Sequence, residues 1–288
     1  MKLLGEEMNT TSVAHLAEPR PTLSRHDHPD PVTEAEPRVD NTSSHSPLGL
    51  DSPTNSNVMD VYADGWHRRW PIYDLDQVIS ERRSTRMFLP HKPVPRELVD
   101  EALALAVRAP SNSNIQPWHM VFASEAARDR LVAALLREAR SKPPRIPPLP
   151  EAFAHSRRET GALVYGSMGI AREDTEGRRV AVLRNWEFFR APLAGIICID
   201  RDLGPADTLS VGMFLQTLLL ALTARGLGTC VQVSIAGYPE VVHEQLDIPA
   251  EYTILCGLAV GYPDPHFPAN NIRTPRNPID ENVVFLDK

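Results

Sequence analysis

The sequence predicts an α+β domain that follows a long polar extension. Several segments carry apolar residues at the spacing of an amphipathic helix, whereas a few short runs rich in Val, Ile and Phe have the composition of strands. These runs, at 118–123, 193–200 and 253–261, are too far apart in sequence for a sandwich built from hairpins. The chain has 288 residues, of which 42% are hydrophobic, so it is long enough to bury a substantial core.

Residues 1–69 differ in composition from the rest of the chain. They are rich in Pro, Ser, Thr, Asp and Asn and have few periodic apolar positions, so we expect a disordered extension before a folded domain at 70–288. An alternative is that translation starts at Met59, just before the folded part. His26 and His28 lack a rigid scaffold and further ligands, so we expect solvated histidines there and no metal site in the chain.

Charge and hydropathy restrict the class of protein. A formal net charge of −7 without a dense basic block gives no support for nucleic-acid binding. The N-terminus lacks the apolar core of a signal peptide, and the longest apolar run, 214–223, is too short to span a bilayer and contains Gln216 and Thr217. The three cysteines lack metal-ligand spacing and are expected to be buried. We therefore expect a cytoplasmic protein that binds neither nucleic acid nor a membrane.

The folded part opens with a predicted helix at 74–83, which places Leu75, Val78 and Ile79 on one face. A short extended segment follows at 86–89. Three prolines then interrupt the chain before the next helix.

That second helix is predicted at 95–109, where a proline suits the first turn and another proline ends the helix. The strand at 118–123 comes next, and Ser124 is positioned to cap a third helix that runs to about residue 140. The segment 141–150 contains five prolines and must be a loop.

The second half contains two buried strands around a long apolar helix. The strand at 193–200 precedes a helix at 207–225 that is apolar on nearly all sides, which is typical of a core or a subunit interface. The strand at 253–261 is followed by an irregular, Pro-rich tail that ends in the apolar run 282–286.

The first candidate site is the run Arg82-Arg83-Ser84-Thr85-Arg86, which combines three guanidiniums and two hydroxyls. Because a phosphate needs several converging donors, this pattern suits phosphate binding. In an extended segment, alternate side chains project to the same side. The alternative is a helix end decorated with cations that complement its dipole.

The second candidate site is the loop at 109–118, in which short polar side chains stand between two prolines. Its donors and acceptors suit the polar edge of a flat heterocycle. The alternative is an ordinary turn between a helix and a strand. The relevant residues are Pro110, Ser111, Asn112 and Asn114.

The spacing of these two motifs resembles the nitroreductase family of FMN-dependent enzymes, and the resemblance extends over 73–285. Further matching segments carry it along the chain, at 169–178, 185–192, 226–230, 261–262 and 271–276. The resemblance implies a central, mostly antiparallel sheet surrounded by helices, in an intertwined homodimer. It also implies two FMN molecules at the dimer interface, each touched by both chains.

By position, the family likeness also implies roles for individual residues. Arg82, Arg83, Ser84 and Arg86 would form the first cofactor segment, with Arg82 and Ser84 at the phosphate and Arg86 near N1 and the C2 carbonyl of the flavin. Pro110, Ser111, Asn112 and Asn114 would come from the partner subunit. The backbone of Val233 and Ser234 would face flavin N5. Arg276 matches the family's C-terminal phosphate ligand, with Arg273 as a close rival, and the C-terminal segment would embrace the other subunit.

The implied activity is transfer of hydride from NAD(P)H through the flavin to a small-molecule electron acceptor, such as a nitroaromatic or a quinone, by a ping-pong mechanism. A cation near N1 would stabilise the charge on the reduced ring. Alternatives on the same fold are reductive dehalogenation, ring dehydrogenation and flavin breakdown. A non-catalytic flavin-binding protein is an alternative of another class. The loop at 141–150 lies where family members vary the cover of the active site, and its prolines favour a stiff lid.

Two further patterns have structural explanations. Gly226 and Gly228 lack a third glycine and follow a helix, so they do not form a dinucleotide-binding fingerprint. The aromatic residues Trp186, Phe188 and Phe189 suit a stacking platform, but core packing is the preferred interpretation.

Overall fold

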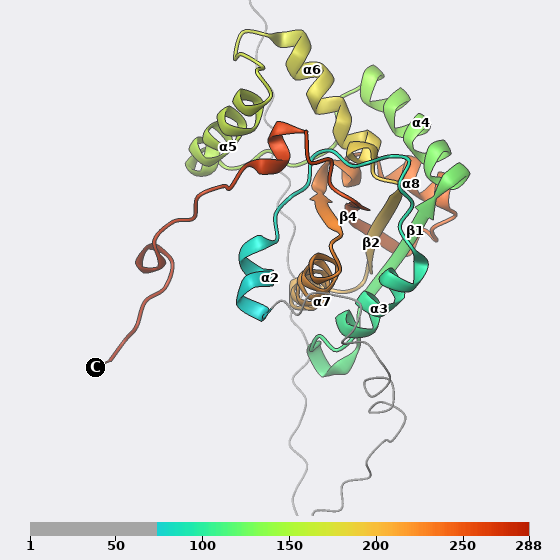
Figure 1. The fold of residues 1–288 in the computed structure, drawn as a ribbon. Coiled ribbons are helices and arrows are strands. Elements are labelled where there is room, and N and C mark those ends of the chain that lie inside the picture. Colours follow the sequence, from blue (N-terminus) through green and yellow to red (C-terminus); the bar gives the residue numbers. More distant parts are fainter. Residues whose placement is uncertain (1–73, 288) are drawn as a thin grey trace, which may run out of the picture. The chain divides into compact units, whose positions relative to one another are not determined.

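A computed structural model describes residues 74–287 (Figure 1). The predicted extension at 1–69, with Met59 and the histidines His26 and His28, lies outside the described residues. Within the described range the fold is α+β, as the sequence predicts.

The strands form one antiparallel sheet in the order β1-β2-β4-β3 (Figure 1). Their bounds are β1 Trp118–Ser124, β2 Leu193–Asp200, β3 Gly228–Gln232 and β4 Tyr252–Gly261. Strands β1, β2 and β4 confirm the predicted runs. The sequence does not predict β3, because this short strand directly follows glycines that indicate a helix end. Central strands β2 and β4 pair along their length, from Leu193 opposite Val260 to Asp200 opposite Tyr252.

Helices lie on both sides of this sheet. Their bounds are α2 Leu75–Glu81, α3 Arg96–Ala106, α4 Glu125–Ser141, α5 Ala154–Ser167, α6 Thr175–Leu183, α7 Pro205–Ala224 and α8 Pro239–Leu246. The sequence predicts α2, α3, α4 and α7 but not the other three. In α5 no residue is buried, so the segment lacks the apolar stripe that marks a helix in sequence. Side-chain capping starts α6, where the Asp174 carboxylate accepts from the N–H of Gly177 at 2.8 Å.

Strand β2 has both faces in the core, because its side chains alternate between two apolar clusters. Ile196 and Cys198 pack with residues of α4 and α8, such as Leu131. Ile197 packs in the second cluster with residues of α3 and α7, such as Phe214. This two-sided burial explains why the strand appears in sequence as a continuous apolar run rather than an alternating one.

Helix α7 is the one described helix that is long and apolar enough, by length and composition, to cross a membrane. It has Val211, Phe214 and Leu218 buried, and these residues belong to the cluster that α7 shares with α3 and the sheet. One side of α7 therefore lies in the core, one of the two settings that its composition predicts, whereas Leu209 is exposed in the single chain.

The aromatic residues before β2 are also core residues. The 3₁₀ turn Arg184–Arg190 buries Trp186, Phe188 and Phe189, which confirms packing over a stacking platform. Phe188 approaches β4 closely, since a Cβ atom added at Gly257 would lie 3.1 Å from its ring.

Helix α2 confirms the predicted helix, although only Val78 is buried on it and Leu75 and Ile79 are 65% and 50% exposed, so the apolar face is not covered in a single chain. One local prediction needs correction. Ser124 does stand at the N-cap of α4, but its side chain makes no capping hydrogen bond there.

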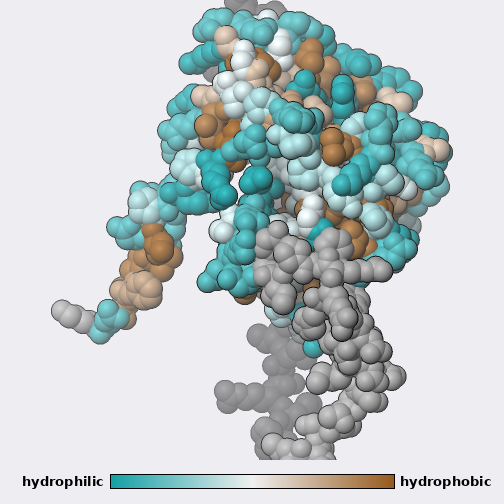
Figure 2. All heavy atoms as spheres, viewed as in Figure 1, coloured by the Kyte–Doolittle hydropathy of each residue, from teal (hydrophilic) through white to brown (hydrophobic). Residues whose placement is uncertain are grey.

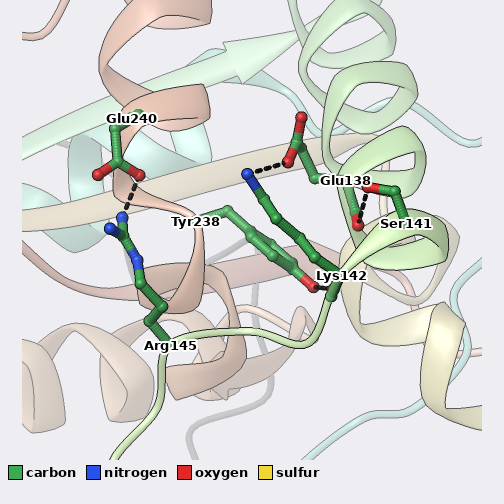
Figure 3. A network of polar contacts seen from close by, with 6 residues as sticks. All are labelled: Glu138, Ser141, Lys142, Arg145, Tyr238 and Glu240. Carbon is green, nitrogen blue, oxygen red and sulfur yellow. Dashed lines mark hydrogen bonds and ion pairs between the residues drawn. The ribbon is translucent and has the colours of Figure 1, made fainter.

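The Pro-rich loop is fixed at its start by a network of polar contacts (Figure 3). The hydroxyl of buried Tyr238 donates to the Lys142 carbonyl at 2.6 Å, and the Arg145 guanidinium pairs with Glu240 at the start of α8. The N–H of Arg145 also donates to the Gly237 carbonyl at 3.0 Å. These contacts hold the loop against the 3₁₀ turn Val233–Gly237. The predicted loop is therefore confirmed, and its first half is braced on that turn.

The contact between Gly237 and Pro144 leaves no room for a side chain. A Cβ atom added at Gly237 would lie 2.5 Å from Pro144 Cβ and 3.2 Å from its Cα. We expect Gly237→Ala to lower the free energy of unfolding by roughly 1–3 kcal/mol, or to detach the loop. Thermal unfolding measures the first effect, and tryptic cleavage after Arg145 measures the second.

Gly166→Ala is the matched control, because an added Cβ meets nothing within 4 Å at that helical position. It should leave the unfolding temperature unchanged or slightly raised, since Ala favours a helix over Gly. Unchanged stability together with unchanged proteolysis in Gly237→Ala would contradict the proposed brace.

Candidate functional site

A pocket of about 460 Å³ lies at the C-terminal end of α2. Five arginines line it, together with a few polar residues and the single carboxylate of Glu81. Six of the predicted site residues meet here: Arg82, Arg83, Ser84, Arg86, Arg273 and Arg276. We call this site the arginine pocket.

The local backbone explains how the first arginine segment reaches the pocket. Helix α2 ends at Glu81, and the chain then leaves Arg82 in an extended conformation. The N–H of Thr85 donates to the Thr229 carbonyl of β3 at 2.9 Å, and Ser84 bridges the same residue in a parallel sense. Thr85 is buried, whereas Ser84 and Arg86 remain partly exposed, as alternation along an extended segment requires.

Close approach fixes this segment on β3. A Cβ atom added at Gly228 would lie 2.5 Å from Thr85 Oγ1, so the strand needs glycine at this position. Cys230, also on β3, lies near Ser84 and Arg86. Burial raises the pKa of its thiol to about 11, although Arg86, a hydrogen bond with Ser84, and Arg82 act in the opposite direction. The first arginine segment is thus held against β3, the strand at one edge of the sheet.

The C-terminal arginines come from a segment almost two hundred residues further along the chain. Arg273 Nη1 donates to the Ser80 carbonyl of α2 at 3.0 Å. Arg276 Nη1 lies 3.0 Å from the Thr274 carbonyl, 2.7 Å from its hydroxyl and 2.9 Å from the Pro275 carbonyl. Both arginines also line the pocket, so either is placed to contact an anion there.

The charge of the arginine pocket suits an anionic ligand. Five guanidiniums face one carboxylate, and guanidinium forks match phosphate oxygens in geometry. Such a concentration of positive charge in one concavity attracts anions and opposes its own assembly.

The second predicted motif lies elsewhere in the single chain. The backbone N–H of Asn112 donates to Ser210 Oγ at 3.2 Å, and its side-chain amide donates to Asp207 Oδ1 at 3.2 Å. Ser111 Oγ accepts from the N–H of Gln116 at 3.0 Å. These contacts tie the loop to the first turns of α7. The residues Pro110, Ser111, Asn112 and Asn114 do not line the arginine pocket.

Val233 and Ser234 open the 3₁₀ turn that follows β3. Val233 is exposed, whereas the hydroxyl of Ser234 is buried and has no hydrogen-bond partner within the described residues. Gln232 donates to the Asn185 carbonyl at 2.6 Å, but its Oε1 atom is likewise buried without a partner. This turn and the first arginine segment are linked through the same strand, so they flank one edge of the sheet.

Sequence reasoning missed two residues of the site. Gln216 lines the arginine pocket from α7, and its signal was a lone amide within an apolar run. Asn270 is buried beside Arg86, and its signal was a pair of asparagines just before Arg273. A larger cavity of about 890 Å³ lies along α3 and β1, and no predicted site residue lines it.

Comparisons with known proteins agree with this geometry. The model of the Nitroreductase family matches residues 79–262. The chain is 38% identical over 219 residues to 4-nitrobenzoate reductase of Pseudomonas putida, covering 74% of this chain and 96% of that protein. It is 35% identical over 225 residues to the 4-nitrobenzoate reductase of a Nocardioides species, covering 75% and 91%.

A solved structure extends the likeness to three dimensions. The FMN-dependent nitroreductase NfnB from Mycobacterium smegmatis, in complex with NADPH, superposes with a TM-score of 0.69 at 31% identity. The match covers 73% of this chain and 97% of that one. The order of the motifs, the antiparallel sheet with its arginine pocket, and these matches lead to one conclusion: the chain belongs to the nitroreductase family.

Proposed function

We propose that this protein binds FMN with its phosphate in the arginine pocket and passes hydride from NAD(P)H to a nitroaromatic acceptor. The observation that carries the proposal is the meeting of Arg82, Arg86 and Arg273 in one pocket at the edge of the sheet. Relatives that reduce 4-nitrobenzoate, and one that depends on FMN and is bound to NADPH, support it.

The residues present fit a phosphate-bearing flavin. Arg82, Ser84 and the C-terminal arginines offer donors to the phosphate, and charge-assisted bonds of this kind are the strong ones. The buried oxygens of Gln232 and Ser234 have no partner in the part of the chain that the structure describes, and they lie at the turn where the flavin ring is expected. When bound, the flavin supplies the hydride chemistry; the protein contributes orientation and charge.

Arg86 has the clearest electrostatic role in this proposal. Its backbone is fixed by a hydrogen bond to Asn270, and its guanidinium donates to the Ser84 carbonyl at 3.2 Å. A fixed cation stabilises negative charge that develops on a nearby ring, with little reorganisation at the moment of transfer. The backbone N–H groups of Val233 and Ser234 would face the reacting nitrogen.

We also propose a homodimer, because apolar surface lies uncovered in the single chain. Leu75, Ile79 and Leu209 are exposed on α2 and α7. Phe285 and Leu286 are 79% and 88% exposed, and Figure 2 shows apolar side chains gathered near the end of the C-terminal segment. A partner subunit would cover these side chains and contribute the loop at 110–114 to the flavin site.

The three cysteines are buried and unpaired, which supports a cytoplasmic location.

A visible spectrum tests the central proposal. The purified protein, or protein supplied with FMN, should show flavin absorbance that bleaches when NADH or NADPH is added without oxygen, and should recover when 4-nitrobenzoate is added. Failure to take up FMN would refute the proposed function. Bound flavin that neither nucleotide reduces would instead indicate a non-catalytic flavin-binding protein.

Arg82→Ala tests the phosphate site. Loss of a charge-assisted bond should weaken FMN affinity by about 2–3 kcal/mol, roughly 30- to 150-fold. Riboflavin, which lacks the phosphate, should bind the variant and the wild type alike. Arg179→Ala is the control, since that arginine pairs with Glu176 on exposed α6, away from the pocket. Equal FMN affinity in Arg82→Ala and wild type would show that the phosphate lies elsewhere.

The double variant Phe285→Asp, Leu286→Asp tests the role of the C-terminal segment. Burying two carboxylates under a partner subunit costs desolvation free energy. The variant dimer should therefore dissociate at a higher protein concentration than the wild type. Sedimentation velocity measures the dimer fraction, and absorbance measures the retained flavin. A dimer as tight as the wild type, with full flavin content, would place the C-terminal segment outside the interface.

A further inference from the structure

Asn270 joins two distant segments of the chain through a buried side-chain amide. Its Oδ1 atom accepts from the N–H of Arg86 at 2.7 Å. Its Nδ2 atom donates to the carbonyls of Met87 at 2.8 Å and Asp264 at 2.9 Å. The residue is only 3% exposed, so these three bonds are shielded from water.

Both segments contribute arginines to the arginine pocket. Arg86 lies on one, and the chain beyond Asn270 carries Arg273 and Arg276. Other contacts align the segments further from the pocket: Leu89 N–H donates to the Tyr262 carbonyl at 2.9 Å, and Asp264 N–H to the Met87 carbonyl at 3.0 Å. Asn270 differs from these two contacts because it binds Arg86, which itself lines the pocket.

Like charges make this link necessary. The guanidiniums on the two segments repel one another when no anion lies between them. A neutral amide adds no charge to the cluster, yet it satisfies one donor and two acceptors at once. An aspartate would lack both N–H donors and would set its oxygens against two carbonyls. An alanine would remove the acceptor of the Arg86 N–H and one donor from each carbonyl.

We infer that Asn270 is a positioning residue that sets the spacing of the two arginine segments and thereby the selectivity of the pocket for a phosphate-bearing flavin. This inference rests on the proposed function. It assigns to Asn270 no contact with the flavin, only with the backbone that carries the arginines.

The ratio of FMN affinity to riboflavin affinity separates positioning from general stability. Asn270→Ala should lower this ratio by about tenfold or more, because spreading the arginines weakens charge-assisted bonds to the phosphate alone. Riboflavin affinity should change by less than about threefold, within the scatter of such effects. Val242→Ala is the matched control: Val242 is fully buried on α8 and does not line the pocket, so its truncation destabilises the fold without removing a pocket residue.

Each outcome has a distinct meaning. A wild-type protein that does not prefer FMN over riboflavin would overturn the proposed function and this inference together. A wild type that prefers FMN, with the preference kept in Asn270→Ala or equally lost in Val242→Ala, would overturn only the inference.

If Asn270→Ala does not fold, hydrogen exchange on the flavin-free wild type provides the test. Adding inorganic phosphate should slow amide exchange in 84–88 and in 268–274 together, because Asn270 couples the segments. Slowing confined to one of the two segments would overturn the inference.

Discussion

Mutual repulsion among five guanidiniums is the constraint on which the rest of this structure depends. An anion site needs these charges close together, and the fold must hold them there before any anion arrives. It does so with hydrogen bonds: the Thr85 N–H donates to the Thr229 carbonyl of β3, the Arg86 N–H to Asn270 Oδ1, and Arg273 Nη1 to the Ser80 carbonyl. The apolar clusters on both faces of β2 and β4 support the sheet to which these segments are bonded.

The sequence predicts the parts of the pocket whose residues are neighbours in the chain better than the parts that come from distant segments. The local motif at 82–86 identifies the first half of the pocket, because its donors are consecutive. The contact of Arg273 with α2 follows only from the tertiary structure. In the sequence, Arg273 and Arg276 were identified as alternatives by the order and spacing of the family motifs. The exposure of Leu75 and Ile79 was unpredictable for a related reason, since periodicity marks an apolar face without saying which chain covers it.

Missed elements have equally physical causes. Strand β3 is five residues long and follows a helix-ending glycine, so turn signals mask it. Helix α5 buries nothing in the single chain, and α8 is only eight residues long. Asn270 has only a weak signal, its place in a pair of asparagines, because a residue that bonds backbone groups far away in sequence leaves no periodic pattern. The family resemblance identified some of these segments, such as 226–230 and 271–276, where local composition and periodicity gave no prediction.

The tight fit of Pro144 on Gly237 has a consequence for how such an enzyme diversifies. The first half of the Pro-rich loop is anchored on the turn at 233–237. A substitution at 142–145 therefore requires a compensating change in that turn. The second half, where Leu149 is exposed, has no such partner among these anchoring contacts. Residues 147–150 can therefore vary with less effect on the turn at 233–237 than residues 142–145, so the two halves of one loop are open to change to different degrees.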